Sequence, residues 1–276
     1  MAARSAGPAG CPLPLFYFLA QAGRAVVATR GETGARGHGL QGPVLAEGVL
    51  RCVVRPGKNG WYQRLLEVTG SEPLPPKSEL GALMASLPEL AGLEALHQEW
   101  LPAIRVWPGP LPEDPLSSGF AQMTLARQAP GTVILPARLD DLAGLGAALK
   151  PYPDAAAARR TLQVSPTPAG PGYVLWWPRS DPSEDPLPSR YGGDEYRWMR
   201  PDLPTDDRPP SILMTWWAVL FALSMLARYH PVDWVAALDP DRSSVAVVLE
   251  RAMEAALEVV PSLVLEAVQA PAGRLP

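Results

Sequence analysis

The sequence predicts an α+β fold that is mainly helical, with apolar helices from both ends packed together beside a smaller strand-rich middle region. Three observations lead to this prediction: an apolar helical segment near the start, a second one near the end, and β-branched stretches with turn signals between them. The chain has 276 residues, of which 47% are hydrophobic and 19% charged, as in a globular protein. We therefore expect a substantial hydrophobic core.

Residues 13–30 (LPLFYFLAQAGRAVVATR) form the first expected helix, which is apolar on most sides. Gly31 follows it where a C-terminal cap belongs. Gly23 has no side chain, so another helix can approach closely there. With the glycine-rich loop that follows, this helix makes up the first predicted region, residues 1–42.

The second predicted region, residues 43–210, mixes strands and loops. Residues 44–68 are expected to be rich in strands: VLRCVVR (49–55) has β-branched and apolar content and precedes a turn signal over 56–60. The segment 61–68 (WYQRLLEV) is expected to pair back as a second strand. Ser78 is a suitable N-cap for a short helix over 79–87. The remaining expected elements are helices over 89–100 and 140–149, strands over 120–125, 132–135 and 173–177, and an extended surface loop over 178–210. An alternative is that 43–210 is an insertion into one helical domain.

The third predicted region, residues 211–276, is a helical unit. The segment 212–227 spans about 24 Å as a helix, which is shorter than a hydrocarbon layer of about 30 Å. We therefore expect a buried core helix rather than a membrane span. Pro231 ends this helix and starts a short one, and Ser243 caps an amphipathic helix that is expected to bend or end at Pro261.

Composition also limits compartment and partners. Cys11 and Cys52 are too few for a disulfide framework or a zinc site, so a soluble cytoplasmic protein is expected, with no metal and no cofactor. The formal net charge of −4 does not indicate a nucleic-acid partner, although a local basic patch is compatible with it. A homo-oligomer formed through the apolar helices is one option for a partner, and no membrane contact is expected.

The first candidate site lies at the end of the second apolar helix. His230 can act as an acid or base and Arg228 can bind an anion, so these two residues are the candidate catalytic pair. Tyr229 and Trp234 are candidate ligand-binding residues beside them. The alternative interpretation is structural: Arg228 complements the helix dipole, and the aromatic rings pack.

The second candidate site is the loop containing Arg36 and His38, whose glycines would let the backbone approach an anion. The alternative is a tightly turned loop without a ligand. If the two apolar helices pack antiparallel, His38 and His230 are predicted to meet. Arg24, on the first helix, is a further candidate ligand-binding residue.

Two stretches resemble the YaaC-like family of uncharacterised bacterial proteins. The first is FYFLAQAGRAVVATR, followed by GHGL at residues 37–40. The second is LSMLARYHPVDWVAAL at residues 223–238, followed by the helix carrying LERAMEAALEVVPSLVLEAV. The resemblance implies a shared helical architecture and an additional helical segment before the first helix, but it implies no reaction.

Two classes of function remain open. The expectation is a non-enzymatic binding or interaction module, because no Walker A motif, dinucleotide fingerprint or zincin helix is present. The alternative is an anion- or nucleic-acid-processing enzyme, similar to HEPN-type RNases, that uses Arg228 and His230. Those enzymes usually space Arg and His by four to six residues, whereas only Tyr229 intervenes here.

Overall fold

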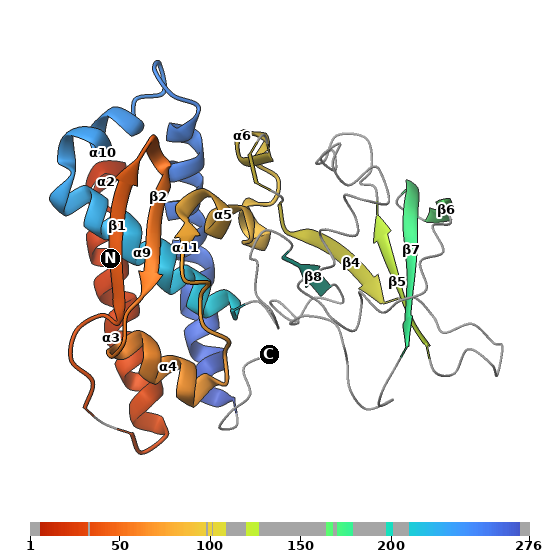
Figure 1. Cartoon of the computed structure of the whole chain (residues 1–276), viewed down its shortest axis with the longest axis horizontal. Coiled ribbons are helices and arrows are strands. Elements are labelled where there is room, and N and C mark those ends of the chain that lie inside the picture. Colours follow the sequence, from red (N-terminus) through yellow and green to blue (C-terminus); the bar gives the residue numbers. More distant parts are fainter. Residues whose placement is uncertain are drawn as a thin grey trace.

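The computed structural model describes residues 6–32, 34–97, 99–100, 102–108, 120–126, 164–167, 170–178, 197–200 and 210–270. The predicted strand over 132–135, the predicted helix over 140–149 and most of the predicted loop over 178–210 lie outside these residues. In Figure 1 the long helices and a small hairpin sheet form one part of the molecule, and a second sheet lies beside them. The mainly helical α+β fold class is confirmed.

The N-terminal helix α3 (Pro12–Thr29) follows the short α2 (Gly7–Gly10) and confirms the helix predicted over 13–30. It ends where Gly31 adopts a φ of +72°, as the cap prediction requires. A Cβ added to Gly23 would lie 2.5 Å from the Trp217 ring and 2.9 Å from Leu65. The predicted close approach at Gly23 is therefore confirmed.

The C-terminal helix α9 (Ile212–Tyr229) runs through the middle of the core, and the Ser211 side chain accepts a hydrogen bond from Met214 N at its start. Among the described helices, α9 is the one long and apolar enough to cross a membrane, yet 78% of that window is buried inside the protein. The core helices of soluble proteins pass the same test. The prediction of a buried core helix agrees with this burial.

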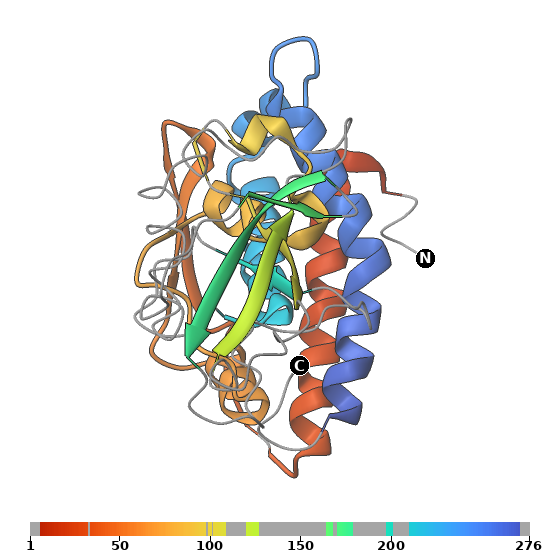
Figure 2. The same cartoon turned by 90° about the vertical axis from the view of Figure 1, so that its right-hand side faces the viewer.

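Helix α10 (Pro231–Ala237) follows α9 directly, and α11 (Val245–Gln269) then packs along both α3 and α9. Figure 2 shows α3 and α11 side by side. The prediction offered a bend or an end of the last helix at Pro261, and the end is wrong, because α11 continues through Pro261 to Gln269. A bend at Pro261 stays a prediction. Pro261 is exposed, and its missing N–H is a local loss that the packing around it outweighs.

The smaller sheet has the antiparallel order β1-β2-β3, from β1 (Leu40–Ala46), β2 (Gly48–Pro56) and β3 (Ser78–Glu79). The strand predicted over 61–68 is wrong: this segment is the helix α4 (Trp61–Thr69). Its buried residues Tyr62, Leu65 and Thr69 recur at helical spacing, and β1 is the strand that pairs with β2.

The short helix α5 (Leu80–Ala85) is fully buried, but Ser78 does not cap it. The Ser78 hydroxyl donates to Pro75 O instead, and Glu79 occupies the N-cap position. The helix predicted over 89–100 is replaced by the 3-10 turn η1 (Pro88–Leu90) and the short α6 (Glu94–His97). Pro88 begins that turn, and the chain turns again before α6, so no continuous helix forms.

The second sheet has the antiparallel order β6-β7-β5-β4-β8. The strands predicted over 120–125 and 173–177 are confirmed as β5 (Phe120–Ala126) and β7 (Gly170–Pro178), which pair with Gln122 opposite Trp176. The other strands are β4 (Ile104–Pro108), β6 (Val164–Thr167) and β8 (Arg197–Met199).

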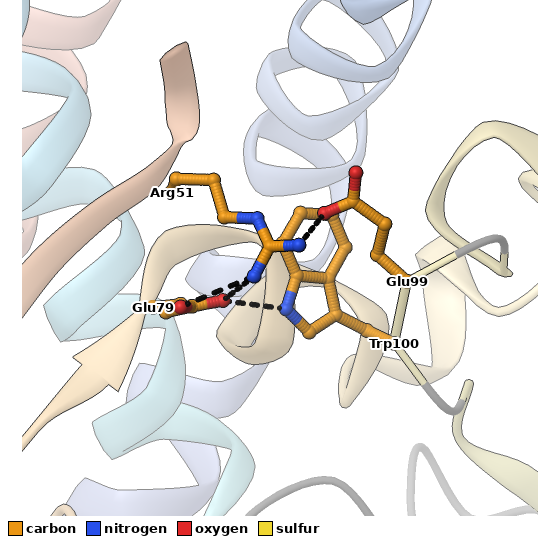
Figure 3. Close-up of polar contacts among 4 residues, drawn as sticks. All are labelled: Arg51, Glu79, Glu99 and Trp100. Atoms are coloured by element: carbon orange, nitrogen blue, oxygen red, sulfur yellow. Dashed lines mark hydrogen bonds and ion pairs between the residues drawn. The ribbon is translucent and has the colours of Figure 1, made fainter. Parts of the chain in front are cut away.

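Two polar clusters join this sheet to the helices. Arg200, which follows β8 and is 1% exposed, donates from Nε to Ser86 O at 3.0 Å and also binds Pro210 O and Thr215 Oγ1. Before β4, Trp100 Nε1 donates to Glu79 Oε2 at 2.9 Å, and Arg51 binds Glu79 and Glu99 while covering the Trp100 ring (Figure 3). These contacts fix where the second sheet leaves the helical part.

Candidate functional site

The loop containing His38 is bound tightly to the start of α4. Gly37 O and His38 O accept hydrogen bonds from Trp61 N (3.2 Å) and Tyr62 N (3.0 Å), and Gln63 Nε2 donates to Gly39 O at 2.8 Å. The first amide groups of α4 thus receive partners from the loop. These amides are not available to an anion, and the loop acts as a cap for the helix.

The glycines of this loop are explained by close backbone contact. A Cβ on Gly39 would lie 2.8 Å from Tyr62 N, and a Cβ on Gly60 would lie 2.4 Å from both N and Cα of Gly39. Both glycines also have positive φ angles, +82° and +142°. The structure therefore places the main chain of residues 37–39 rigidly, and His38 is presented from a fixed backbone.

His38 rests on two aromatic rings of the core. Its ring centroid lies 5.1 Å from that of Phe16 on α3 and 5.8 Å from that of Phe221 on α9. The side chain is nonetheless exposed, so one part of the imidazole is covered by the phenylalanines and the other part faces solvent. An exposed imidazole on an apolar base can contact a ligand without moving the core.

Two arginines act on His38. Burial lowers the pKa of the His38 imidazole below its ordinary value, and the positive charges of Arg24 and Arg228 lower it further. Both guanidinium groups are exposed, and in the part of the chain that the structure describes neither has an acidic partner within ion-pair distance. His38 therefore loses its proton more readily than an ordinary histidine, and it lies between two positive charges that have no acidic partner among the described residues.

The two arginines lie on opposite sides of His38. Gly23 of α3 faces Trp217 of α9, whereas Phe16 faces Phe221 at 5.6 Å between ring centroids, so the two helices run in opposite directions. Arg24 is two turns beyond Phe16, about 12 Å along α3, and Arg228 is two turns beyond Phe221, about 10 Å along α9. Arg24, His38 and Arg228 thus form an elongated surface with a positive group on each side of the imidazole, which we call the arginine–histidine strip.

Each arginine of the strip lies against an aromatic ring. The Arg24 guanidinium carbon is 5.2 Å from the centre of the half-buried Trp61 ring, and that of Arg228 is 5.1 Å from the centre of the Tyr229 ring. Stacking of this kind fixes the plane of a guanidinium while leaving its N–H donors free. The role of Trp61 was not anticipated from the sequence, because residues 61–68 were assigned to a strand.

The other predicted site residues range from buried to exposed. His230 is half-buried between α9 and α10, where its backbone N–H donates to Leu226 O and its carbonyl accepts from Trp234 N. Trp234 is 1% exposed and donates from Nε1 to Ala9 O at 2.9 Å. Tyr229 is 60% exposed, and Arg36 is exposed in the loop.

The predicted meeting of His38 and His230 stays a prediction. Among the described residues, the His38 ring contacts the rings of Phe16 and Phe221. At the end of α9, the charge of Arg228 lowers the pKa of His38. The structure therefore joins the two candidate sites through Arg228.

The sequence model of the YaaC-like protein family matches residues 1–268 of the chain. The chain belongs to this family. The match covers both motifs that form the strip, the GHGL loop and the helix end with Arg228 and Tyr229. Neither the curated proteins nor the solved structures gave a match. Within the described residues of this YaaC-like protein, no cluster of three His, Cys, Asp or Glu side chains could hold a metal ion.

Proposed function

We propose that this YaaC-like protein is a binding module for an extended anionic ligand that lies along the arginine–histidine strip. The observation that carries the proposal is the placement of two exposed arginines, one on each side of an exposed histidine and without acidic partners among the described residues. Exposed positive groups that have no acidic partner among the described residues are available to an external anion.

The distance along the strip favours a ligand with several charges. Arg24 and Arg228 project from backbone positions separated by about 20 Å of helix length, with His38 between them. A single phosphate or carboxylate group lying beside one of these guanidinium groups leaves the other available to a second anionic group. A chain of anionic groups can contact both at once, and each contact reinforces the other because the ligand is tethered.

A soluble cytoplasmic bacterial protein remains part of this proposal. Burial of α9 inside the fold and the thiols of Cys11 and Cys52, which are free and buried, support it. Burial raises the pKa of the Cys52 thiol to about 12, so Cys52 is expected to be chemically inert.

The test is the binding of inorganic polyphosphate, which is measured by titration calorimetry at several salt concentrations. Neutralisation of two ligand charges predicts that log K falls with log salt with a slope of about −1.4, and that Arg24→Gln or Arg228→Gln reduces the slope by about 0.7. Arg251→Gln removes one exposed positive charge from α11, where it pairs with Glu254, and serves as the matched control. Equal binding by all four proteins, or no binding by the wild type, would refute the proposal.

The enzyme alternative is tested on the same bound ligand. If Arg228 and His230 form a catalytic pair, polyphosphate or RNA is shortened during incubation, and His230→Gln stops the reaction while leaving binding intact. Intact ligand after prolonged incubation, with the wild type saturated, supports the binding module.

A further inference from the structure

Two exposed tyrosines accompany the strip. On α3, Tyr17 precedes Arg24 by seven residues and therefore projects from the same face of the helix. Tyr17 is 47% exposed and directly follows Phe16, the residue that contacts His38. Because Arg24 on this face acts on His38, Tyr17 lies on the side of α3 that carries the strip.

At the other end, Tyr229 is 60% exposed, and its ring lies against the Arg228 guanidinium at 5.1 Å. Large aromatic rings exposed at a protein surface leave apolar area in water, and a tyrosine beside an arginine offers a flat surface next to a charge. The strip thus alternates between positive groups and exposed rings: Arg24, Tyr17 with His38, then Arg228 with Tyr229.

We infer that the extended anion is a single-stranded nucleic acid, whose phosphates contact Arg24 and Arg228 and whose bases stack on Tyr17 and Tyr229. This inference rests on the binding function proposed above and names its ligand class. Surfaces that bind single strands combine a positive track along the backbone with aromatic side chains on which bases stack. Polyphosphate and acidic peptides would use the arginines but have no flat rings to place on the tyrosines.

The inference also predicts little dependence on base sequence. The described groups of the strip supply charge and exposed rings, so recognition would come from charge and stacking, which every base supplies. The exposed hydroxyl of each tyrosine is not required, and Tyr17→Phe or Tyr229→Phe is expected to preserve binding.

The experiment compares a fluorescent twelve-nucleotide oligouridylate, unlabelled polyphosphate and polyglutamate as ligands for the full chain. Tyr17→Leu and Tyr229→Leu are expected to weaken oligouridylate binding by roughly 5- to 100-fold each, the equivalent of losing one stacked base. Polyphosphate binding should change less than twofold in Tyr17→Leu, and in Tyr229→Leu it should weaken less than oligouridylate binding, because Tyr229 also orients the Arg228 guanidinium. Phe18→Leu is the matched control, because Phe18 is 48% exposed on the same helix but projects from another face.

The outcomes separate this inference from the proposed function. Polyphosphate binding that needs both arginines, together with oligouridylate binding that ignores the tyrosines, overturns the nucleic-acid inference and leaves the anion-binding proposal in place. Tighter binding of polyglutamate than of oligouridylate also overturns it. Loss of oligouridylate binding in the leucine variants alone, with recovery in the phenylalanine variants, is the expected result.

Discussion

Gly60→Ala is expected to dislodge the loop that presents His38. The added Cβ would lie 2.4 Å from both N and Cα of Gly39, which are backbone atoms that cannot rotate away. Overpacking of this kind typically costs about 1–3 kcal/mol. The φ angle of +142° belongs to a region that is almost exclusive to glycine, which adds about 1–3 kcal/mol. Because the whole fold is stable by only about 5–15 kcal/mol, the combined loss is a large fraction.

Gly48→Ala separates the steric cost of the added Cβ from the cost of the positive φ angle. Gly48 has a φ of +101°, but nothing lies within 4 Å of its added Cβ, so this variant incurs the backbone term alone. Urea unfolding followed by tryptophan fluorescence should therefore place the Gly60→Ala midpoint below that of Gly48→Ala by about 0.3–1 M, for an m-value of about 3 kcal/mol/M. Equal midpoints would show that the loop is not held against α4 as described.

Three further predictions concern the core and the strip. Gly23→Ala should lower stability although alanine favours helices by about 1 kcal/mol, because its Cβ would meet the Trp217 ring at 2.5 Å; a higher melting temperature would contradict this. Arg200→Lys should cost about 3 kcal/mol in a urea titration, because a lysine cannot bind Ser86, Pro210 and Thr215 together; an unchanged midpoint would count against the buried contacts. The lowered pKa of His38 means that the unfolded chain binds its proton more readily, so stability should fall as pH drops below about 6.5. Urea midpoints of wild type and His38→Gln between pH 7.5 and 5 check this, and parallel curves would contradict it.

The helices were predictable where one segment carried the whole signal. The apolar run of α9 and the cap at Gly31 appear in the local sequence, as does the need for a small residue at Gly23. Residues 61–68 were misassigned because their β-branched and aromatic content resembles a strand. The helical conformation of this segment is stabilised by the carbonyl groups of residues 37 and 38, which accept hydrogen bonds from the first amides of α4. These residues lie far from α4 in the sequence.

The candidate site was predicted residue by residue but not as an arrangement. Arg24, His38 and Arg228 were each selected, yet their relation depends on how α3 crosses α9, which local sequence patterns do not determine. Trp234 illustrates the opposite difficulty. A tryptophan beside a candidate pair suggests a ligand contact, whereas its burial and its bond to Ala9 O depend on α2, more than two hundred residues earlier. Nothing in the local sequence indicates that Arg200 is buried, because its burial depends on the carbonyl and hydroxyl groups that accept its hydrogen bonds.

The most direct test of the arginine–histidine strip is the pKa of His38, measured by NMR with and without polyphosphate. The resonance is assigned with His38→Gln, and Arg36→Gln serves as the control for a loop charge that is not among the causes of the lowered His38 pKa. The strip predicts that Arg24→Gln and Arg228→Gln each raise the pKa of His38, and that polyphosphate raises it in the wild type but not in the double variant. A His38 pKa that responds neither to the two arginines nor to polyphosphate would contradict the existence of the strip.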